Sequence, residues 1–183
     1  MKTKLSRRSF VENLTLATSG IALLSSTSFL NAFNSKTDVL EGYNPYAGTN
    51  PDMRQGIFEN YIKVTGTVYS KETEQPISGA LVEVWHLSPN SKKYRHRAKL
   101  KTDANGQYSF LTDPPNKEKG QMPAIHFKLS TVNDSYCSRL WIHKNTAFIS
   151  SEHWARNQGL GDRLLPKKEI HTFHETITFN LSI

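Results

Sequence analysis

From Tyr61 to the end of the chain, short runs with a two-residue hydrophobic period follow one another. This period is typical of strands buried on one face, because successive side chains of a strand point to opposite sides. Stretches rich in turn-forming residues, such as SKETEQPISG and TDANG, separate the runs. No segment has a long helical period, although SSEHWARNQGL is expected to form one short helix. The pattern predicts an all-β chain folded as an antiparallel β-sandwich, with strands in YIKVTGTVYS, ALVEVWHL, QYSFLT, AIHFKLS, SRLWIH and ETITFNLSI.

The run AIHFKLS assigns its side chains to two faces. Ile125, Phe127 and Leu129 alternate with more polar residues and are expected to face the core. His126 then faces the other way. A strand histidine on the face away from the core is a candidate metal ligand or an ordinary strand residue, and its neighbours in space decide between the two.

The first residues have the composition of an export signal. MKTKLSRRSF places basic residues ahead of NLTLATSGIALLSSTSFL, an apolar run rich in small residues. The pair Arg7 and Arg8 favours the twin-arginine type, whose route carries folded proteins, and an ordinary secretory signal is the alternative. Cleavage is expected after Ser28 or Ala32. The sequence therefore predicts a protein exported to the periplasm or the exterior.

The rest of the chain divides into an arm and one domain. Residues 33–60, centred on NPYAGTNPD, show no period and are interpreted as an extended arm or loop that follows the signal at 1–32. Residues 61–183 are interpreted as the sandwich. The chain has 183 residues, which suits one domain with its own core. The signal region is too short and too rich in Ser and Thr for a membrane anchor.

The charge and the cysteine content limit which partners and which cross-links the sequence predicts. The formal charge is +7, and Lys2, Lys4, Arg7 and Arg8 against Glu12 account for +3 of it, which leaves +4 for the remainder. The remaining basic residues are scattered through loop-like stretches such as SKKYRHRAKLK and LPKKE, without interleaved aromatics. They are interpreted as a solvated face, and nucleic acid is not an expected partner. Cys137 is the only cysteine, so the domain contains no internal disulfide.

The order of motifs from Tyr61 to Leu129 resembles that of the intradiol ring-cleavage dioxygenases, the catechol and protocatechuate 3,4-dioxygenase family. The resemblance rests on VTGTVYSKETEQPISGALVEVWHLSPNSKKYRHR, followed by KTDANGQYSFLT and PAIHF, with an echo in FNLSI. The first half also occurs in carboxypeptidase-regulatory and transthyretin-like sandwiches, whereas YRH and P-x-I-H-F favour the dioxygenases. The resemblance implies Fe(III), held on a β-sandwich by two tyrosinates and two histidines, and a small aromatic diol as the substrate.

Only part of this implied ligand set has a counterpart here. Tyr94 and His126 match one tyrosine and one histidine of the family pattern. The loop PPNKEKGQ has no tyrosine at the place of the second, and Ala124 occupies the first position of the family's H-x-H pair. The family's arginine before this pair falls on Gln121. Two of the four expected iron ligands are therefore missing.

Other histidines are candidates to fill the gap. If KKYRHR is extended, His96 lies on the same face as Tyr94, and a replacement site of Tyr94, His96 and His126 follows. His86 and His143 are weaker candidates. The remaining histidines are not expected to bind a metal. His171 and His174 are interpreted as a solvated pair, and His153 as a packed side chain.

Two functions remain open from the sequence. One is an exported dioxygenase that binds Fe(III) and inserts O2 between the two hydroxyl-bearing carbons of a catechol-type ring. The other is a catalytically degenerate sandwich that acts outside the cytoplasm as a binding or structural module. The substrate, the metal and the oligomeric state are not determined by the sequence.

Overall fold

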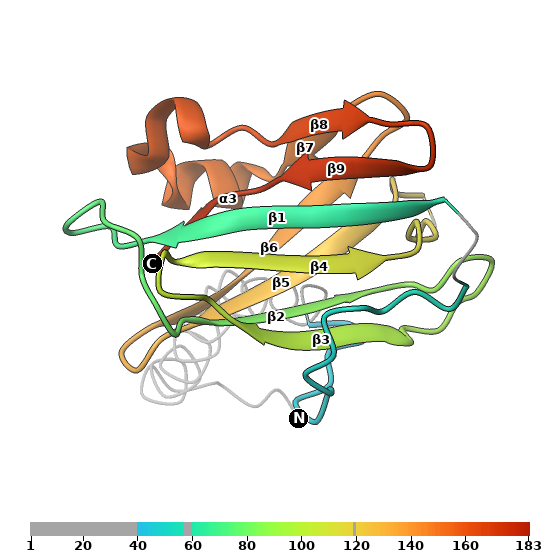
Figure 1. Ribbon diagram of the computed structural model, residues 1–183, viewed down its shortest axis with the longest axis horizontal. Helices are drawn as coiled ribbons and strands as arrows, with labels where there is room; N and C mark the ends of the chain where they lie inside the picture. The colour runs from blue at the N-terminus through green and yellow to red at the C-terminus, as the bar shows by residue number, and fades with distance from the viewer. Residues whose placement is uncertain (1–39, 57–59, 119) are drawn as a thin grey trace, which may run out of the picture. The chain divides into compact units, whose positions relative to one another are not determined.

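The computed structural model describes residues 40–56, 60–118 and 120–183, and within these ranges the strands form two five-stranded sheets (Figure 1). The first sheet has the order β10-β1-β9-β8, and β4, which is outside this order, also pairs with β1. It contains β1 (Tyr61–Tyr69), β4 (Gln107–Thr112), β8 (Lys167–Ile170), β9 (His174–Thr178) and β10 (Leu181–Ser182). The second sheet has the order β3 (His96–Lys101), β2 (Leu81–His86), β5 (Ala124–Ser130), β6 (Ser135–Ile142) and β7 (Ala147–Ile149).

The two sheets face each other across one hydrophobic core. In Figure 1, β5 and β6 pass behind β1 and β4, and buried side chains from both sheets form a single cluster that includes Val64, Phe110, Phe127 and Phe179. The predicted all-β sandwich is confirmed. So is the short helix, because α3 (Ser151–Arg156) and the 3-10 helix η1 (Gln158–Arg163) follow β7.

The face assignment of β5 is also confirmed. Ile125, Phe127 and Leu129 are at most 1% exposed and lie in the core cluster. His126 points to the outer face of the second sheet, where it is in register with Trp85 of β2. His126 is nevertheless only 1% exposed, because a second, smaller cluster covers it.

The sheet pairing is antiparallel except between β1 and its neighbours β9 and β10, which run parallel to it. β9 and β10 together are the predicted run ETITFNLSI, interrupted at Phe179 and Asn180. Here the Asn180 side chain accepts a hydrogen bond from the Thr67 amide at 3.0 Å. A Cβ atom on Gly66 would lie 1.9 Å from the Phe179 carbonyl oxygen, so the glycine of VTGTV is needed for this close approach.

Two basic stretches that were expected to be loop-like are strands. The stretch SKKYRHRAKLK contains β3, and LPKKE leads into β8. In β3 the side chains of His96, Ala98 and Leu100 are buried, and the basic residues between them are more exposed. Both strands lie at sheet edges, where charged side chains are common because they discourage pairing with another chain. The expectation of loops at these two stretches is therefore wrong, because edge strands also carry clusters of basic residues.

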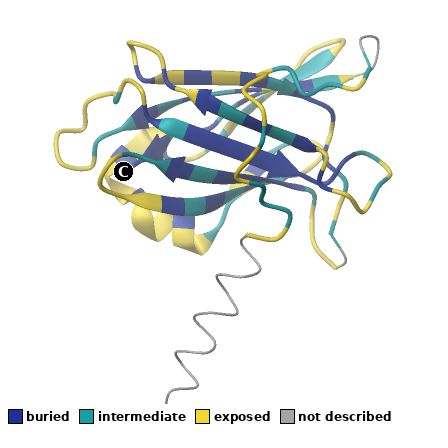
Figure 2. Cartoon of the chain, turned by 90° about the horizontal axis from the view of Figure 1, so that it is seen from below, coloured by how far each residue is buried: buried dark blue, intermediate teal, exposed yellow. Residues whose placement is uncertain are grey.

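Residues 42–183 form one compact unit, distinct from residues 1–41. The export signal predicted for 1–32 lies outside the described residues, as does part of the arm predicted for 33–60. Within 42–56 the chain makes turns and one isolated bridge, from Asp52 to Leu111 of β4. In the part of the chain that is described, no helix has the length and apolar character to span a bilayer. Figure 2 shows the buried residues concentrated in the strands and the exposed ones in the connections.

Candidate functional site

Three aromatic rings form a small cluster on the outer face of the second sheet. Trp85 of β2 and His126 of β5 are directly paired across the sheet, and their rings stack at 5.3 Å with an interplanar angle of 15°. Tyr94, which lies just before β3, meets the edge of the His126 ring at 6.1 Å and 71°. Trp85 and Tyr94 are buried together with Leu87. The structure therefore brings together Tyr94 and His126, as their proposed shared role requires.

Glu118 joins these two side chains. The Tyr94 hydroxyl donates to Glu118 Oε1 at 2.8 Å, and His126 Nε2 lies 3.0 Å from the same oxygen. His126 Nδ1 is buried and has no hydrogen-bond partner among the described residues. Because the carboxylate oxygen is an acceptor, His126 Nε2 is the donor in this contact. The hydrogen bonds from His126 and then Tyr94 lower the pKa of Glu118, although partial burial opposes them.

The cluster is covered from the outside by the segment before β1. Tyr43 packs on Trp85 with ring centroids 5.2 Å apart, and its hydroxyl donates to the Glu83 carboxylate at 3.1 Å. Gly42 lies against Tyr94, because a Cβ atom there would be 2.1 Å from the Tyr94 ring. Gly42 also has φ +75°, which favours glycine. These contacts hold the Trp85 and Tyr94 rings in place.

Arg139 is a further charged residue beside the site. It lies on β6 directly opposite His126, and its positive charge contributes to the lowered pKa of Glu118. Arg139 Nε is buried with no hydrogen-bond partner among the described residues. Gln121, at the family's arginine position, is exposed, and Ala124 is buried on the same strand face as His126.

Sequence reasoning missed Glu118 and Arg139. The signal for Glu118 was that it is the only acidic residue of PPNKEKGQ, the loop in which a second ligand was sought. Arg139 had no such signal. Its position opposite His126 depends on the register between β5 and β6, which the local pattern does not specify.

His96 does not join Tyr94 and His126. It pairs with His86 across β2 and β3, whereas Trp85 pairs with His126. Because consecutive residues of a strand point to opposite faces, His86 and His96 lie on the inner face and His126 on the outer face. The predicted set of Tyr94, His96 and His126 therefore does not converge in this structure. The ligand roles of Tyr94 and His126 stay predictions.

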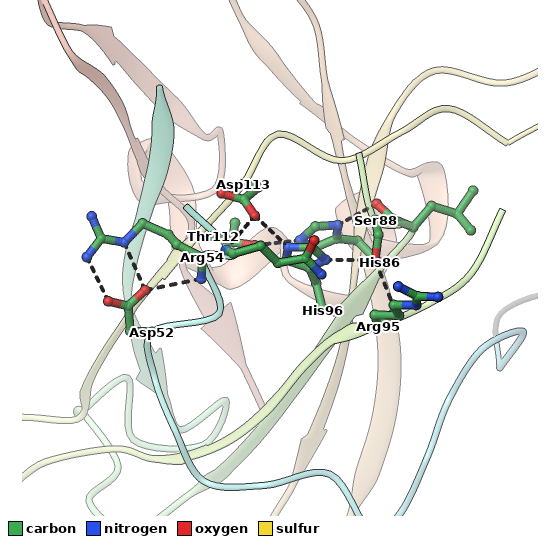
Figure 3. Close-up of polar contacts among 10 residues, drawn as sticks. Asp52, Arg54, His86, Ser88, Arg95, His96, Thr112 and Asp113 are labelled. Atoms are coloured by element: carbon green, nitrogen blue, oxygen red, sulfur yellow. Dashed lines mark hydrogen bonds and ion pairs between the residues drawn. The ribbon is translucent and has the colours of Figure 1, made fainter. Parts of the chain in front are cut away.

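His96 belongs instead to a buried polar network at one end of the sandwich (Figure 3). Its Nε2 lies 2.8 Å from Asp113 Oδ2, and its Nδ1 lies 2.9 Å from Ser88 Oγ. The amide of Gln55 also donates to Asp113 Oδ2, at 2.9 Å. The serine, histidine and aspartate are each at most 3% exposed, and Ser88 Oγ accepts from the Arg95 amide. The order of groups is that of a nucleophile triad, but its burial makes the network a structural connection between β2, β3 and the end of β4.

His86 extends the same network and stacks on His96 at 4.6 Å. Its Nδ1 donates to the Leu87 carbonyl at 2.8 Å, and its Nε2 lies 2.5 Å from Thr112 Oγ1. Burial lowers the pKa of His86 to about 3. His86 is therefore a neutral residue of the interior. Its partners are Leu87, Thr112 and His96, and not Tyr94 or Glu118.

The remaining histidines are His143, a weaker ligand candidate, and three for which the sequence predicts packed or solvated side chains, His153, His171 and His174. His143 and His171 are exposed, and His171 stacks on His174 at 4.5 Å in the β8–β9 hairpin. His153 is buried, with Nδ1 2.7 Å from Ser138 Oγ, and burial lowers its pKa to about 4. Across the described residues, no three side chains of His, Cys, Asp or Glu lie close enough together to hold a metal ion.

Cavities occur away from the cluster. One of about 390 Å³ lies beside the β8–β9 hairpin and is lined by Tyr61, His143 and His174 among others. Another, of about 290 Å³, lies beside η1 and includes Lys71 and Arg163. Neither cavity reaches Tyr94, Glu118 or His126. The Glu118 side chain is 18% exposed, whereas Tyr94 and His126 are buried.

Comparison with known proteins places the fold. No protein-family profile and no curated protein matches the sequence. Among solved structures, the dioxygenase domain of a dioxygenase carbohydrate-binding protein fusion from Streptomyces sp. SirexAA-E matches with a TM-score of 0.59 and 16% identity, over 77% of this chain and 91% of that one. An intradiol ring-cleavage dioxygenase from Tetranychus urticae matches with a TM-score of 0.59 and 15% identity, over 77% and 89%.

A longer alignment is found with a chlorocatechol 1,2-dioxygenase from Pseudomonas putida. Its TM-score is 0.57 at 17% identity, and the alignment covers 98% of this chain and 89% of that one. At these identities the matches establish the fold and leave the chemistry to the site. The chain therefore has the fold of the intradiol ring-cleavage dioxygenases, as the resemblance in its sequence predicted.

Proposed function

We propose that the chain is an exported, divergent intradiol-dioxygenase-type protein that binds Fe(III) on the outer face of its second sheet and oxygenates a catechol-type aromatic. The observation that carries the proposal is the convergence of Tyr94 Oη and His126 Nε2 on one point, Glu118 Oε1, at 2.8 Å and 3.0 Å. The two donor atoms come from β5 and from the segment just before β3, and both already lie within hydrogen-bond distance of the same oxygen.

The residues present fit a ferric ion in their chemistry. A phenolate oxygen is a hard anionic donor that stabilises Fe(III), and an imidazole nitrogen suits iron as well. The stack on Trp85 sets the orientation of the His126 ring, and the contact with Gly42 sets that of Tyr94. Tyr94 and His126 would thus hold the metal.

Bound Fe(III) supplies a centre at which the catecholate chelates and reacts with O2. In the overall reaction, the bond between the two hydroxyl-bearing carbons breaks and both oxygen atoms of O2 enter the product, a dicarboxylic acid, so no external reductant is required. The chain's own residues contribute charge and proton positions. The Tyr94 hydroxyl already directs its proton toward an ionised carboxylate, and Arg139 provides positive charge beside a site that would take an anionic substrate.

The second candidate is a catalytically degenerate module that binds a ligand or serves a structural role outside the cytoplasm. Two observations favour it. Ala124 and the loop PPNKEKGQ supply neither the second histidine nor the second tyrosine of the family pattern, and neither of the cavities described above opens onto Tyr94 or His126.

The test uses the full chain, supplied with ferric citrate and freed of excess metal. Iron stoichiometry, the visible absorption of tyrosinate bound to Fe(III), and O2 uptake with catechol are measured on wild type, Tyr94→Phe and His143→Gln. We expect one iron per chain, visible colour and O2 uptake in wild type and in His143→Gln, whose changed histidine is exposed. Tyr94→Phe is expected to lose the colour.

Each other outcome is decisive. Wild type that binds iron with colour but consumes no O2 with any catechol offered would support the degenerate module. Wild type that takes up no iron would refute the metal centre. Colour retained in Tyr94→Phe would mean that another tyrosine binds the metal.

A further inference from the structure

Glu118 occupies the place where the two predicted ligands meet. Its Oε1 atom is 2.8 Å from Tyr94 Oη and 3.0 Å from His126 Nε2. Two ligand atoms that each lie about 2.1 Å from one metal, at right angles to each other, are about 3 Å apart. The distances from Glu118 Oε1 to Tyr94 Oη and to His126 Nε2 are thus compatible with neighbouring ligands in a coordination sphere.

The side chain of Glu118 suits the same role, because its Oε1 atom already accepts the hydrogen bond of the Tyr94 hydroxyl. A carboxylate oxygen is a hard donor of the kind that Fe(III) prefers. Together with a Tyr94 phenolate it would place two negative charges on the ion, and His126 would add a neutral nitrogen.

The loop that carries Glu118 is tied to the segment that carries Tyr94. The amide of Asn116 donates to the Leu87 carbonyl at 3.1 Å, and its side-chain amide donates to the Ser91 carbonyl at 2.8 Å. Further along the loop, Lys117 forms a bridge with Pro123 just before β5, the strand of His126. Glu118 is therefore held between the attachments of the other two donors, and its position follows from the fold.

We propose that Glu118 is the third protein ligand of the metal centre, so that the site is a set of one tyrosinate, one carboxylate and one imidazole. This inference rests on the proposed function, because it assumes that Tyr94 and His126 bind the metal. The competing role for Glu118 is a plug whose carboxylate closes the site by its hydrogen bonds and must leave when a cation arrives. The two roles predict opposite effects of removing the charge.

The experiment measures Fe(III) binding by the full chain in wild type, Glu118→Gln, Glu118→Ala and Glu152→Gln. Glu118→Gln keeps the size of the side chain and an oxygen that accepts from Tyr94, but it removes the charge. Glu152, exposed at the start of α3, is the matched control. Ferric citrate is the metal source, and a competing chelator gives relative affinities. The thermal unfolding midpoint of each metal-free variant verifies that it is folded.

If Glu118 is a ligand, both Glu118→Gln and Glu118→Ala should bind Fe(III) at least about tenfold more weakly than wild type does. Replacing a residue that only supports a metal ligand already costs about tenfold or more in affinity, and a ligand should cost no less. Glu152→Gln should bind as wild type does. The tyrosinate absorption of any iron that remains bound should persist in Glu118→Gln, because Tyr94 is intact.

Affinity that is unchanged or higher in Glu118→Gln, with tyrosinate colour, would overturn the ligand role and identify a plug, while the proposed metal centre would stand. Absence of iron and colour in wild type would instead refute the metal centre itself, and the role of Glu118 with it. Failure of this inference alone and failure of the proposed function are therefore distinguishable.

Discussion

Acid should destabilise the fold through His86, and replacing this residue should remove part of the effect. His86 is fully buried and neutral, with its Nδ1 proton donated to the Leu87 carbonyl. Burial lowers its pKa from 6.5 to about 3; the neighbouring His96 lowers it further and Asp113 opposes the shift. Because the folded pKa lies below the unfolded one, between about pH 6.5 and pH 3 only the unfolded chain binds this proton. Stability is therefore complete above pH 6.5 and is lost as the pH falls toward 3.

The size of the loss follows from the distance between the assay pH and the unfolded pKa. The assay pH of 5 lies about 1.5 units below the unfolded pKa of 6.5. Proton binding to this histidine in the unfolded chain therefore lowers the unfolding free energy by about 2 kcal/mol. His86→Asn retains a donor for the Leu87 carbonyl but does not titrate. It will have its own lower stability, since it loses the stack on His96, so the comparison concerns the change with pH and not the stability itself.

Urea unfolding followed by tryptophan fluorescence at pH 7 and pH 5 measures this change. Wild type should lose about 2 kcal/mol more than His86→Asn between the two pH values. His86→Gln serves as a second non-titrating variant. An equal loss in all three would refute the reasoning, because it would show that His86 is not held neutral by the fold.

Three further predictions concern the core, the cover of the site and the export route. Phe127→Ala, at a position that is 0% exposed between the sheets, should lower the unfolding free energy by about 3–5 kcal/mol, and a loss below about 1 kcal/mol in urea unfolding would contradict the assigned core. Gly42→Ala should lower it by at least about 1 kcal/mol because of the positive φ and the 2.1 Å approach to the Tyr94 ring; unchanged stability would show that the segment does not cover Tyr94. Replacing Arg7 and Arg8 together by Lys should block export in a cell-fractionation assay if the twin-arginine route reads the guanidinium pair, and normal export of that variant would favour the general secretory route.

Most of the sandwich was predictable from local pattern. Apolar and polar residues alternate along β1, β2, β4, β5 and β6, and this alternation can be recognised from neighbouring residues alone. It arises because a half-buried strand must place apolar side chains at every second position. Gly106, in the turn TDANG, has the positive φ, +71°, that turn chemistry required. The strands that were missed are short or basic and lie at sheet edges, as β7 and β8 do. Their pattern is weak because only part of each strand is buried.

The site divides in the same way. The sequence by itself identified Tyr94 and His126 as candidate ligands, since both stand in recognisable motifs, and it placed His126 on the face away from the core. Only the tertiary structure decided which side chains lie next to Tyr94 and His126. His96 went to the opposite face because β2 and β3 pair in a register that sets it against His86, while Glu118 and Arg139 came to His126 from a loop and from the next strand. Such contacts depend on strand register and loop path, which are set by the packing of the whole sandwich, and a local sequence pattern contains neither.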